Sequence, residues 1–135
     1  MQQAVSSRQE NSIVKFTDLK AWQEGHKLVL AIYAITRQFP QDEQFALTSQ
    51  LRRAAVSLTS NLAEGFSRQT RADTLHFYAM AQGSLTEVQS QLLIARDVDY
   101  VSAANTQKIA DQTIVVHKLI TGLMKALRAG RGASK

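Results

Sequence analysis

The segment RRAAVSLTSNLAEGFSR, residues 52–68, is the most informative part of the sequence about the fold. Its apolar residues continue a spacing of three and four that starts at Leu47, which is typical of a helix with one apolar face. That face comprises Leu47, Leu51, Ala54, Ala55, Leu58 and Leu62. A second stripe is polar and comprises Arg53, Ser57, Ser60 and Glu64, with Asn61 at its border. Because serines at the centre of a stripe leave the backbone open to close approach, the second stripe predicts a packing groove with a charge at each end.

The same helical spacing recurs in three further segments, and alternation typical of strands is absent. Pro40, the Thr70–Asp73 capping pair and the polar segment before Ser102 separate the segments. The sequence therefore predicts four helices at about 18–38, 42–66, 70–98 and 102–129. Long helices joined by short turns favour an all-α fold, an up-down-up-down antiparallel four-helix bundle over 15–129. Residues 1–14 and 130–135 are expected to be mobile tails, the second of them basic.

The composition excludes several classes of protein. The chain has 135 residues, which is enough for one domain with a real core. It contains no cysteine, so disulfides and thiolate chemistry are excluded. No apolar run approaches the roughly 20 residues that cross a bilayer. The N-terminal sequence MQQAVSSRQENS lacks the apolar core of a signal peptide, so a cytoplasmic protein without membrane contact is expected.

The net charge of +5 lies in the last quarter of the chain. Basic and acidic residues cancel up to Val101, whereas residues 102–135 hold six basic residues and one acidic residue. The residues that a basic helix face would present to RNA or DNA are Lys118, Lys125, Arg128 and Arg131. A solvated helix with a basic last turn, favoured by the helix dipole, gives the same pattern. Both interpretations stay open from the sequence.

The first helix carries more apolar surface than a bundle core requires. One stripe contains Leu19, Trp22, His26, Val29 and Tyr33, and His26 is expected to be a core residue. The other stripe contains Leu28, Ile32, Ile35 and Phe39, and we assign it to a homo-oligomer interface. Large exposed apolar patches usually mark association, so the excess predicts self-assembly.

The polar residues of the second and third helices are interpreted as structural. An antiparallel turn at 67–70 would place Arg53 beside Ser84 and within reach of Glu87, unless Arg53 pairs with another subunit. Asn61 and Glu64 are expected to satisfy polar groups between helices or subunits, because no second titrating group lies nearby for acid-base chemistry. We expect no catalytic residue, cofactor, metal site or small-molecule substrate. Four glycines suggest close approach of helices: Gly25, Gly65, Gly83 and Gly122.

Several segments together resemble a known family. They are FTDLKAWQEGHKLVLAIYAIT, FPQDEQFALTSQLRRAAVSLTSNLAEGFSR and MAQGSLTEVQSQLLIARDVDY, within residues 16–101. They are similar to the four-helix-bundle proteins encoded in intervening sequences of bacterial 23S ribosomal RNA genes. SLTSNLAEG departs from that family's usual form, in which a proline and isoleucines are more common. The resemblance implies a ring of protomers, most often five. A more distant relative, the accessory protein of diversity-generating retroelements, implies nucleic-acid binding only by analogy of fold.

Two functions follow as hypotheses. The first is a non-enzymatic homo-oligomer, a pentamer by the resemblance, whose basic fourth helices bind RNA or DNA. The second is a protein-protein scaffold that uses the apolar face of the first helix and binds no nucleic acid. Nucleic-acid binding would weaken with salt and with neutralisation of the basic residues, whereas a scaffold would respond to neither.

Overall fold

The computed structural model describes residues 14–130, and this part of the chain contains four long helices and no strand. The long helices are α2 (Lys20–Thr36), α3 (Leu47–Phe66), α4 (Arg71–Asp97) and α5 (Ala103–Arg128). Two short 3-10 helices precede α2 and α3, η2 (Phe16–Asp18) and η3 (Gln41–Glu43). The prediction of an all-α fold with four helices is confirmed. The predicted tails lie outside the described residues, except for Val14 and Gly130.

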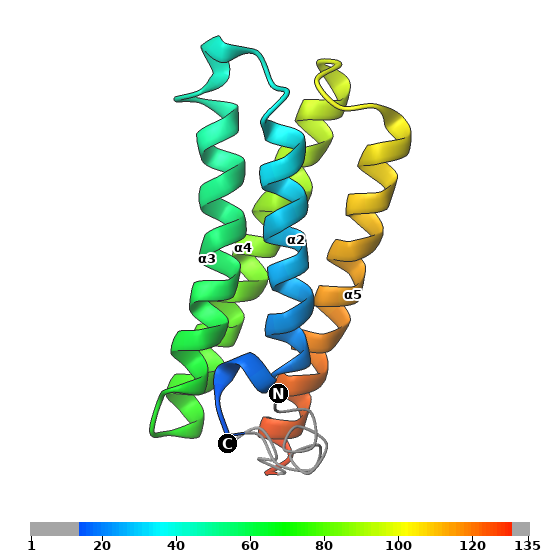
Figure 1. The fold of residues 1–135 in the computed structure, drawn as a ribbon. Coiled ribbons are helices and arrows are strands. Elements are labelled where there is room, and N and C mark those ends of the chain that lie inside the picture. Colours follow the sequence, from blue (N-terminus) through cyan, green and yellow to red (C-terminus); the bar gives the residue numbers. More distant parts are fainter. Residues whose placement is uncertain (1–13, 131–135) are drawn as a thin grey trace, which may run out of the picture.

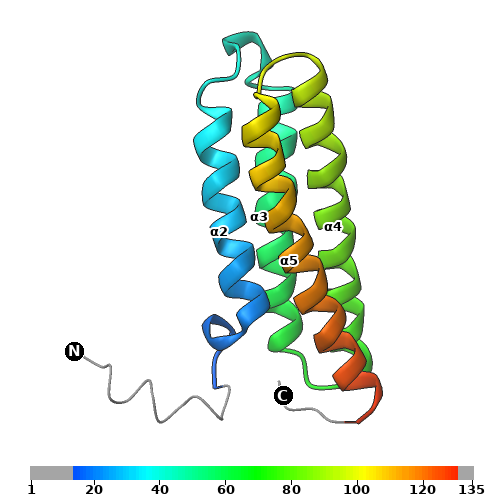
Figure 2. The same cartoon turned by 90° about the vertical axis from the view of Figure 1, so that its right-hand side faces the viewer.

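The four helices surround one core. α2 and α4 each pack against α3 and α5, so the order around the core is α2, α3, α4, α5. Figure 1 shows the connections 37–46 and 98–102 at one end of the molecule and the turn 67–70 at the other end. In Figure 2, turned by 90°, α5 lies between α2 and α4 in the foreground. The α2–α5 side and the α3–α4 side are therefore opposite sides of the molecule.

The helix ends follow local hydrogen bonds. The Thr70 hydroxyl accepts from the Asp73 amide at 3.1 Å, and the Ser102 hydroxyl accepts from the Asn105 amide at 3.1 Å. These caps start α4 and α5 within one residue of the predicted positions. α3 begins five residues later than predicted, at Leu47. Glu43 lies in η3, and its carboxylate accepts from the Leu47 amide at 3.2 Å, so the chain turns once before the helix starts.

The core face of α2 is not the face that we predicted. Leu28 and Ile32 are fully buried and Phe39 is 7% exposed, so their assignment to an oligomer interface is wrong. Ile35 is only partly buried against the core. Ala21 and Gly25 lie on the same side of α2 as Leu28. Because both residues are small, α2 can approach α3 closely on this side, and this explains why this side faces the core. A Cβ added to Gly25 would lie 3.2 Å from Thr59 Cγ2.

The other stripe of α2 lies at the edge of the core beside α3. Trp22 and Val29 are partly buried, and His26 is exposed and stacks on Trp22 with 4.8 Å between ring centroids. The prediction that His26 belongs to the core is therefore wrong. Leu30 next to this stripe is 57% exposed. α2 does carry surplus apolar surface, but on residues other than those we assigned.

Only two of the four glycines that we singled out serve close packing. A Cβ on Gly65 would lie 2.8 Å and 2.9 Å from two Tyr78 ring carbons, so α3 and α4 meet there without space for a side chain. Gly25 faces Thr59 as described above. Gly83 and Gly122 have nothing within 4 Å of an added Cβ, so the expectation is wrong for both.

None of the helices within residues 14–130 has the length and apolarity that crossing a membrane requires.

Candidate functional site

The polar stripe of α3 supplies a hydrogen-bond network against α4. Ser57 Oγ and Ser84 Oγ lie 2.8 Å apart. Asn61 Nδ2 donates to the Ser57 carbonyl at 2.9 Å and to Ser57 Oγ at 3.2 Å. The structure thus brings three of the predicted polar residues together inside one chain.

Arg53 and Glu87 stay outside this network. Ser84 meets Ser57 rather than Arg53, so the predicted register of α3 on α4 is wrong by one helical turn. Within the described residues no ion pair joins Arg53 to Glu87. Both are exposed and line an open groove of about 470 Å³ between α3 and α4. Its lining comprises Phe45, Ser49, Gln50, Arg53, Ala54, Ser57, Glu87 and Gln91.

Glu64 and Ser60 also lie apart from the network. The Glu64 carboxylate forms an ion pair with Arg68 at the end of α3, on a partly exposed surface. The Arg68 guanidinium lies over the Phe77 ring, 4.5 Å from its centroid. Ser60 is exposed on α3. This part of the stripe therefore closes the α3–α4 turn rather than holding a reactive group.

Arg52 connects α3 to α2. Its Nε donates to Thr36 Oγ1 at 2.8 Å, and its guanidinium lies over the Tyr33 ring at 4.6 Å. Thr36 in turn donates to the Ile32 carbonyl at 2.7 Å. Because the guanidinium is held by a hydroxyl and a ring inside one chain, Arg52 acts in packing.

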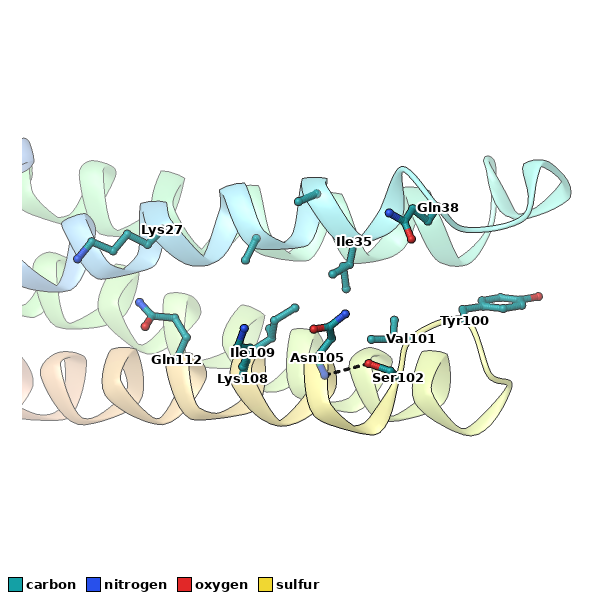
Figure 3. A pocket seen from close by; sticks show the side chains of 12 residues that line it. Lys27, Ile35, Gln38, Tyr100, Val101, Ser102, Asn105, Lys108, Ile109 and Gln112 are labelled. Carbon is teal, nitrogen blue, oxygen red and sulfur yellow. Dashed lines mark hydrogen bonds between the residues drawn. The ribbon is translucent and has the colours of Figure 1, made fainter.

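A groove between α2 and α5 has a volume of about 640 Å³ (Figure 3). Its apolar lining comes from Ala31, Ala34, Ile35, Val101 and Ile109. Its polar lining comes from Lys27, Gln38, Tyr100, Ser102, Asn105, Lys108 and Gln112. The lining holds two lysines and no acidic residue. We refer to it as the α2–α5 groove.

Tyr100 braces the end of the α2–α5 groove. Its hydroxyl donates to Glu43 Oε2 at 2.8 Å, and its ring lies 5.3 Å from the Phe39 ring. The hydrogen bond to the Glu43 carboxylate raises the pKa of Tyr100, because ionisation of the phenol would remove the donor. Tyr100 thereby ties the connection 98–102 to η3.

The basic face of α5 is exposed. Lys118, Lys125 and Arg128 all point to solvent, and none of them forms an ion pair with a described residue. The Arg71 guanidinium, from the start of α4, lies 4.0 Å from the position of a Cβ on Gly130, just beyond the end of α5. Arg131 lies outside the described residues. We refer to Lys118, Lys125 and Arg128 as the basic face.

Groups with shifted pKa values are dispersed. Burial raises the pKa of Tyr78 to about 12 in the core. The Gln112 side-chain amide, followed by Lys27, lowers the pKa of Glu24 at the α2–α5 contact. Neither lies beside Tyr100. Within residues 14–130 these groups do not converge on one cleft as an acid-base pair would.

Two features escaped the sequence interpretation. The α2–α5 groove is formed by residues far apart in the chain, so periodicity gives no sign of it. Phe45 is 89% exposed, the most exposed large apolar side chain that the structure describes. In the sequence, the feature that points to Phe45 is its place as a lone aromatic residue in the polar segment QDEQF, residues 41–45.

Comparison with known proteins gives the family and the fold. The family model for the 23S rRNA-intervening sequence protein matches residues 17–122. The chain also resembles the crystal structure of a protein with unknown function from the S23 ribosomal protein family of Bacteroides thetaiotaomicron. The TM-score is 0.72 at 18% identity, and the match covers 78% of this chain and 98% of that chain.

No curated protein matches the chain. The resemblance in the DLKAW, QLRRAAVS, SNLAEG and GSLTE segments is nevertheless matched by the family model, which spans most of the described residues. The chain belongs to the 23S rRNA-intervening sequence protein family.

Proposed function

We propose that this chain is the up-down-up-down protomer of a non-enzymatic, ring-shaped homo-oligomer that binds the phosphate backbone of RNA or DNA. The basic face of α5 is the contact surface. The observation that carries the proposal is that Lys118, Lys125 and Arg128 are exposed and form no ion pair with a described residue. Lysine and arginine side chains that contact phosphates displace the counterions condensed on the nucleic acid, and the release of these counterions drives binding.

Two further features support this surface. Beyond Asp111 the sequence contains no acidic residue, so nothing on the second half of α5 opposes an anion. Arg71 at the start of α4 adds a positive charge near the end of α5. A ring repeats the surface once per protomer, and repeated weak contacts strengthen one another through effective concentration. The number of five protomers is taken from the family resemblance.

The test is binding of a labelled single-stranded RNA and of a DNA duplex by fluorescence anisotropy at several salt concentrations. The wild-type affinity is expected to fall steeply as salt rises. A variant with Lys118→Gln, Lys125→Gln and Arg128→Gln is expected to lose most of the affinity and to show a shallower salt slope.

The matched control removes the same charge elsewhere. Lys20→Gln, Arg37→Gln and Arg96→Gln lower the net charge by the same amount at exposed positions outside the basic face. This variant is expected to keep binding close to wild type. Equal losses in both variants would indicate a general charge effect and would contradict the assignment to α5. Absence of salt-sensitive binding in the wild type would reject the nucleic-acid function altogether.

A second candidate is a scaffold that binds a protein through the surplus apolar surface of α2. Leu30 at 57% exposure favours it, together with the partly buried Trp22 and Tyr33 beside it. Partner binding by this surface would be insensitive to the Gln substitutions on α5 and would be weakened by Leu30→Ser. These responses are the reverse of those expected for phosphate binding.

A further inference from the structure

We propose that the segment around Phe45 of one copy inserts into the α2–α5 groove of a second copy. This contact would be the interface between neighbouring protomers of the proposed homo-oligomer. The inference therefore rests on the self-assembly proposed above. It uses a protruding aromatic residue on one side of the molecule and an open, partly apolar groove on the opposite side.

The donor surface is Phe45 with the acidic residue three positions before it. Phe45 is 89% exposed, whereas a large aromatic side chain normally buries roughly 150 to 250 Å² and contributes strongly to the interfaces where it occurs. It lies at the mouth of the α3–α4 groove, whose other lining residues are mainly polar. Asp42 in η3 is exposed and forms no ion pair with a described residue. The segment thus presents an aromatic ring and a free carboxylate together.

The acceptor surface is the α2–α5 groove. Its volume of about 640 Å³ leaves space for an aromatic side chain and part of its backbone. In Figure 3 Ile35 and Ile109 extend from α2 and α5 toward the space between the two helices. Lys108 is exposed at the groove and forms no ion pair with a described residue, whereas Lys27 pairs with Glu24 at 2.9 Å. An apolar lining with a free lysine complements a phenylalanine with a nearby aspartate.

The two surfaces lie at the same end of the molecule. Phe45 belongs to the connection 37–46, and the groove includes Gln38, Tyr100, Val101 and Ser102 from that end. The hydrogen bond from Tyr100 to Glu43 joins the groove to η3 within one chain. Both surfaces are therefore held at a common height along the helices, which lets copies meet side by side.

The two surfaces also lie on opposite sides, because α3–α4 and α2–α5 face away from each other around the core. Phe45 therefore reaches the groove of a neighbouring copy rather than its own. A contact between two different surfaces is heterologous, and repeated copies form a closed ring if the rotation between them closes. This geometry matches a ring of protomers without requiring a separate second interface.

The first experiment measures the mass of the full-length chain by light scattering after size-exclusion chromatography, over a range of concentrations. Phe45→Ala removes the donor ring, and Ala34→Glu places a carboxylate in the acceptor groove. Each is expected to raise the dissociation constant of self-association at least about tenfold, as loss of a central aromatic anchor does. The matched controls are Ile114→Ala, an exposed apolar residue on the α4–α5 side, and Ser90→Glu, an exposed position on α4.

The second experiment mixes the two weakened variants in equal amounts. Phe45→Ala retains an intact groove, and Ala34→Glu retains an intact Phe45, so one functional contact can form between them. The mixture is expected to give a particle of two chains that neither variant gives alone. Circular dichroism with a thermal melt of each variant verifies that the loss of assembly does not arise from unfolding.

The outcomes separate the two proposals. A wild-type chain that stays at 15.0 kDa at all concentrations overturns both the proposed assembly and this contact. A wild-type oligomer that survives both Phe45→Ala and Ala34→Glu overturns the contact alone. A mixture that stays as single chains while each variant is folded overturns the heterologous arrangement. Loss of assembly in both variants, with recovery of a two-chain particle on mixing, supports the contact.

Discussion

The Ser57 and Ser84 hydroxyl oxygens lie 2.8 Å apart, and this contact marks the register of α3 against α4. Ser84 is 8% exposed, so its hydroxyl has little access to water. The Asn61 amide holds Ser57 from the same helix. At this level of the bundle, α3 and α4 meet through two small hydroxyl side chains beside the apolar core.

Ser84→Ala is expected to lower the free energy of unfolding by about 1 kcal/mol, because it leaves Ser57 without its partner across the helices. The double variant Ser57→Ala/Ser84→Ala is expected to be less destabilised than the two single variants together. Urea unfolding of the four proteins gives the coupling energy. Strict additivity would show that the two hydroxyls do not interact in solution. Ser60→Ala, at an exposed position on α3, serves as the control and should change little.

Gly65→Ala is expected to destabilise the fold by about 1 to 3 kcal/mol, because its Cβ would lie 2.8 Å from the Tyr78 ring. Gly83→Ala and Gly122→Ala are expected to stabilise it by about 0.5 to 1 kcal/mol each, because a helix favours alanine where space is open. Thermal unfolding of the three variants measures the contrast. Destabilisation by alanine at Gly83 would show that another molecule packs on that surface.

Leu28→Ala is expected to cost about 2 to 5 kcal/mol, because the side chain is fully buried in the core. Leu30→Ala changes a side chain that is 57% exposed and is expected to cost less than about 1 kcal/mol. Chemical unfolding at two protein concentrations tests both. If the loss of unfolding free energy in Leu28→Ala disappeared on dilution, Leu28 would belong to an interface between chains and not to the core of one chain.

Gln112→Leu is expected to raise the pKa of Glu24 toward 4.5, because the Gln112 amide is the main group that lowers it. Gln112 Nε2 donates to Glu24 Oε1 at 3.0 Å and to the Glu24 carbonyl at 2.8 Å. A lowered pKa in the folded state stabilises the protein above the unfolded pKa, and this stabilisation is lost as the pH falls through the folded pKa. The deficit of Gln112→Leu in urea unfolding should therefore be larger near pH 7 than near pH 3. An equal loss of stability at both pH values would indicate that Gln112 stabilises the protein only through its hydrogen bond to the Glu24 carbonyl.

Tyr78→Phe is expected to stabilise the protein by about 1 kcal/mol, because the Tyr78 hydroxyl is buried and has no hydrogen-bond partner among the described residues. Burial raises the pKa of Tyr78 from 10.0 to about 12. The raised pKa favours the folded state below the unfolded pKa, and that contribution is lost as the pH rises through the folded pKa. The advantage of Tyr78→Phe should therefore grow as the pH rises from about 9 to about 11. A constant difference across that range would mean that the phenol does not ionise on unfolding.

The features that depend on neighbours along the chain could be predicted from the order of residues. The apolar spacing gave four helices, and Thr70 and Ser102 gave the starts of α4 and α5, because a cap joins residues three positions apart. The polar stripe that contains Ser57 and Asn61 was visible for the same reason. Helical period is a local property, so it can be read from the order of residues.

How the helices meet could not be predicted from the order of residues and became visible only in the folded chain. Spacing showed two apolar stripes on α2 but not that Leu28 and Ile32 would face the core, since that choice depends on how closely Gly25 lets α3 approach. A shift of one turn along α4 keeps nearly the same residues on one face, so the sequence could not distinguish Arg53 from Ser57 as the neighbour of Ser84. The α2–α5 groove and the exposure of Phe45 depend on contacts between residues distant in the chain. Such contacts are selected by packing of the whole core, which no local pattern encodes.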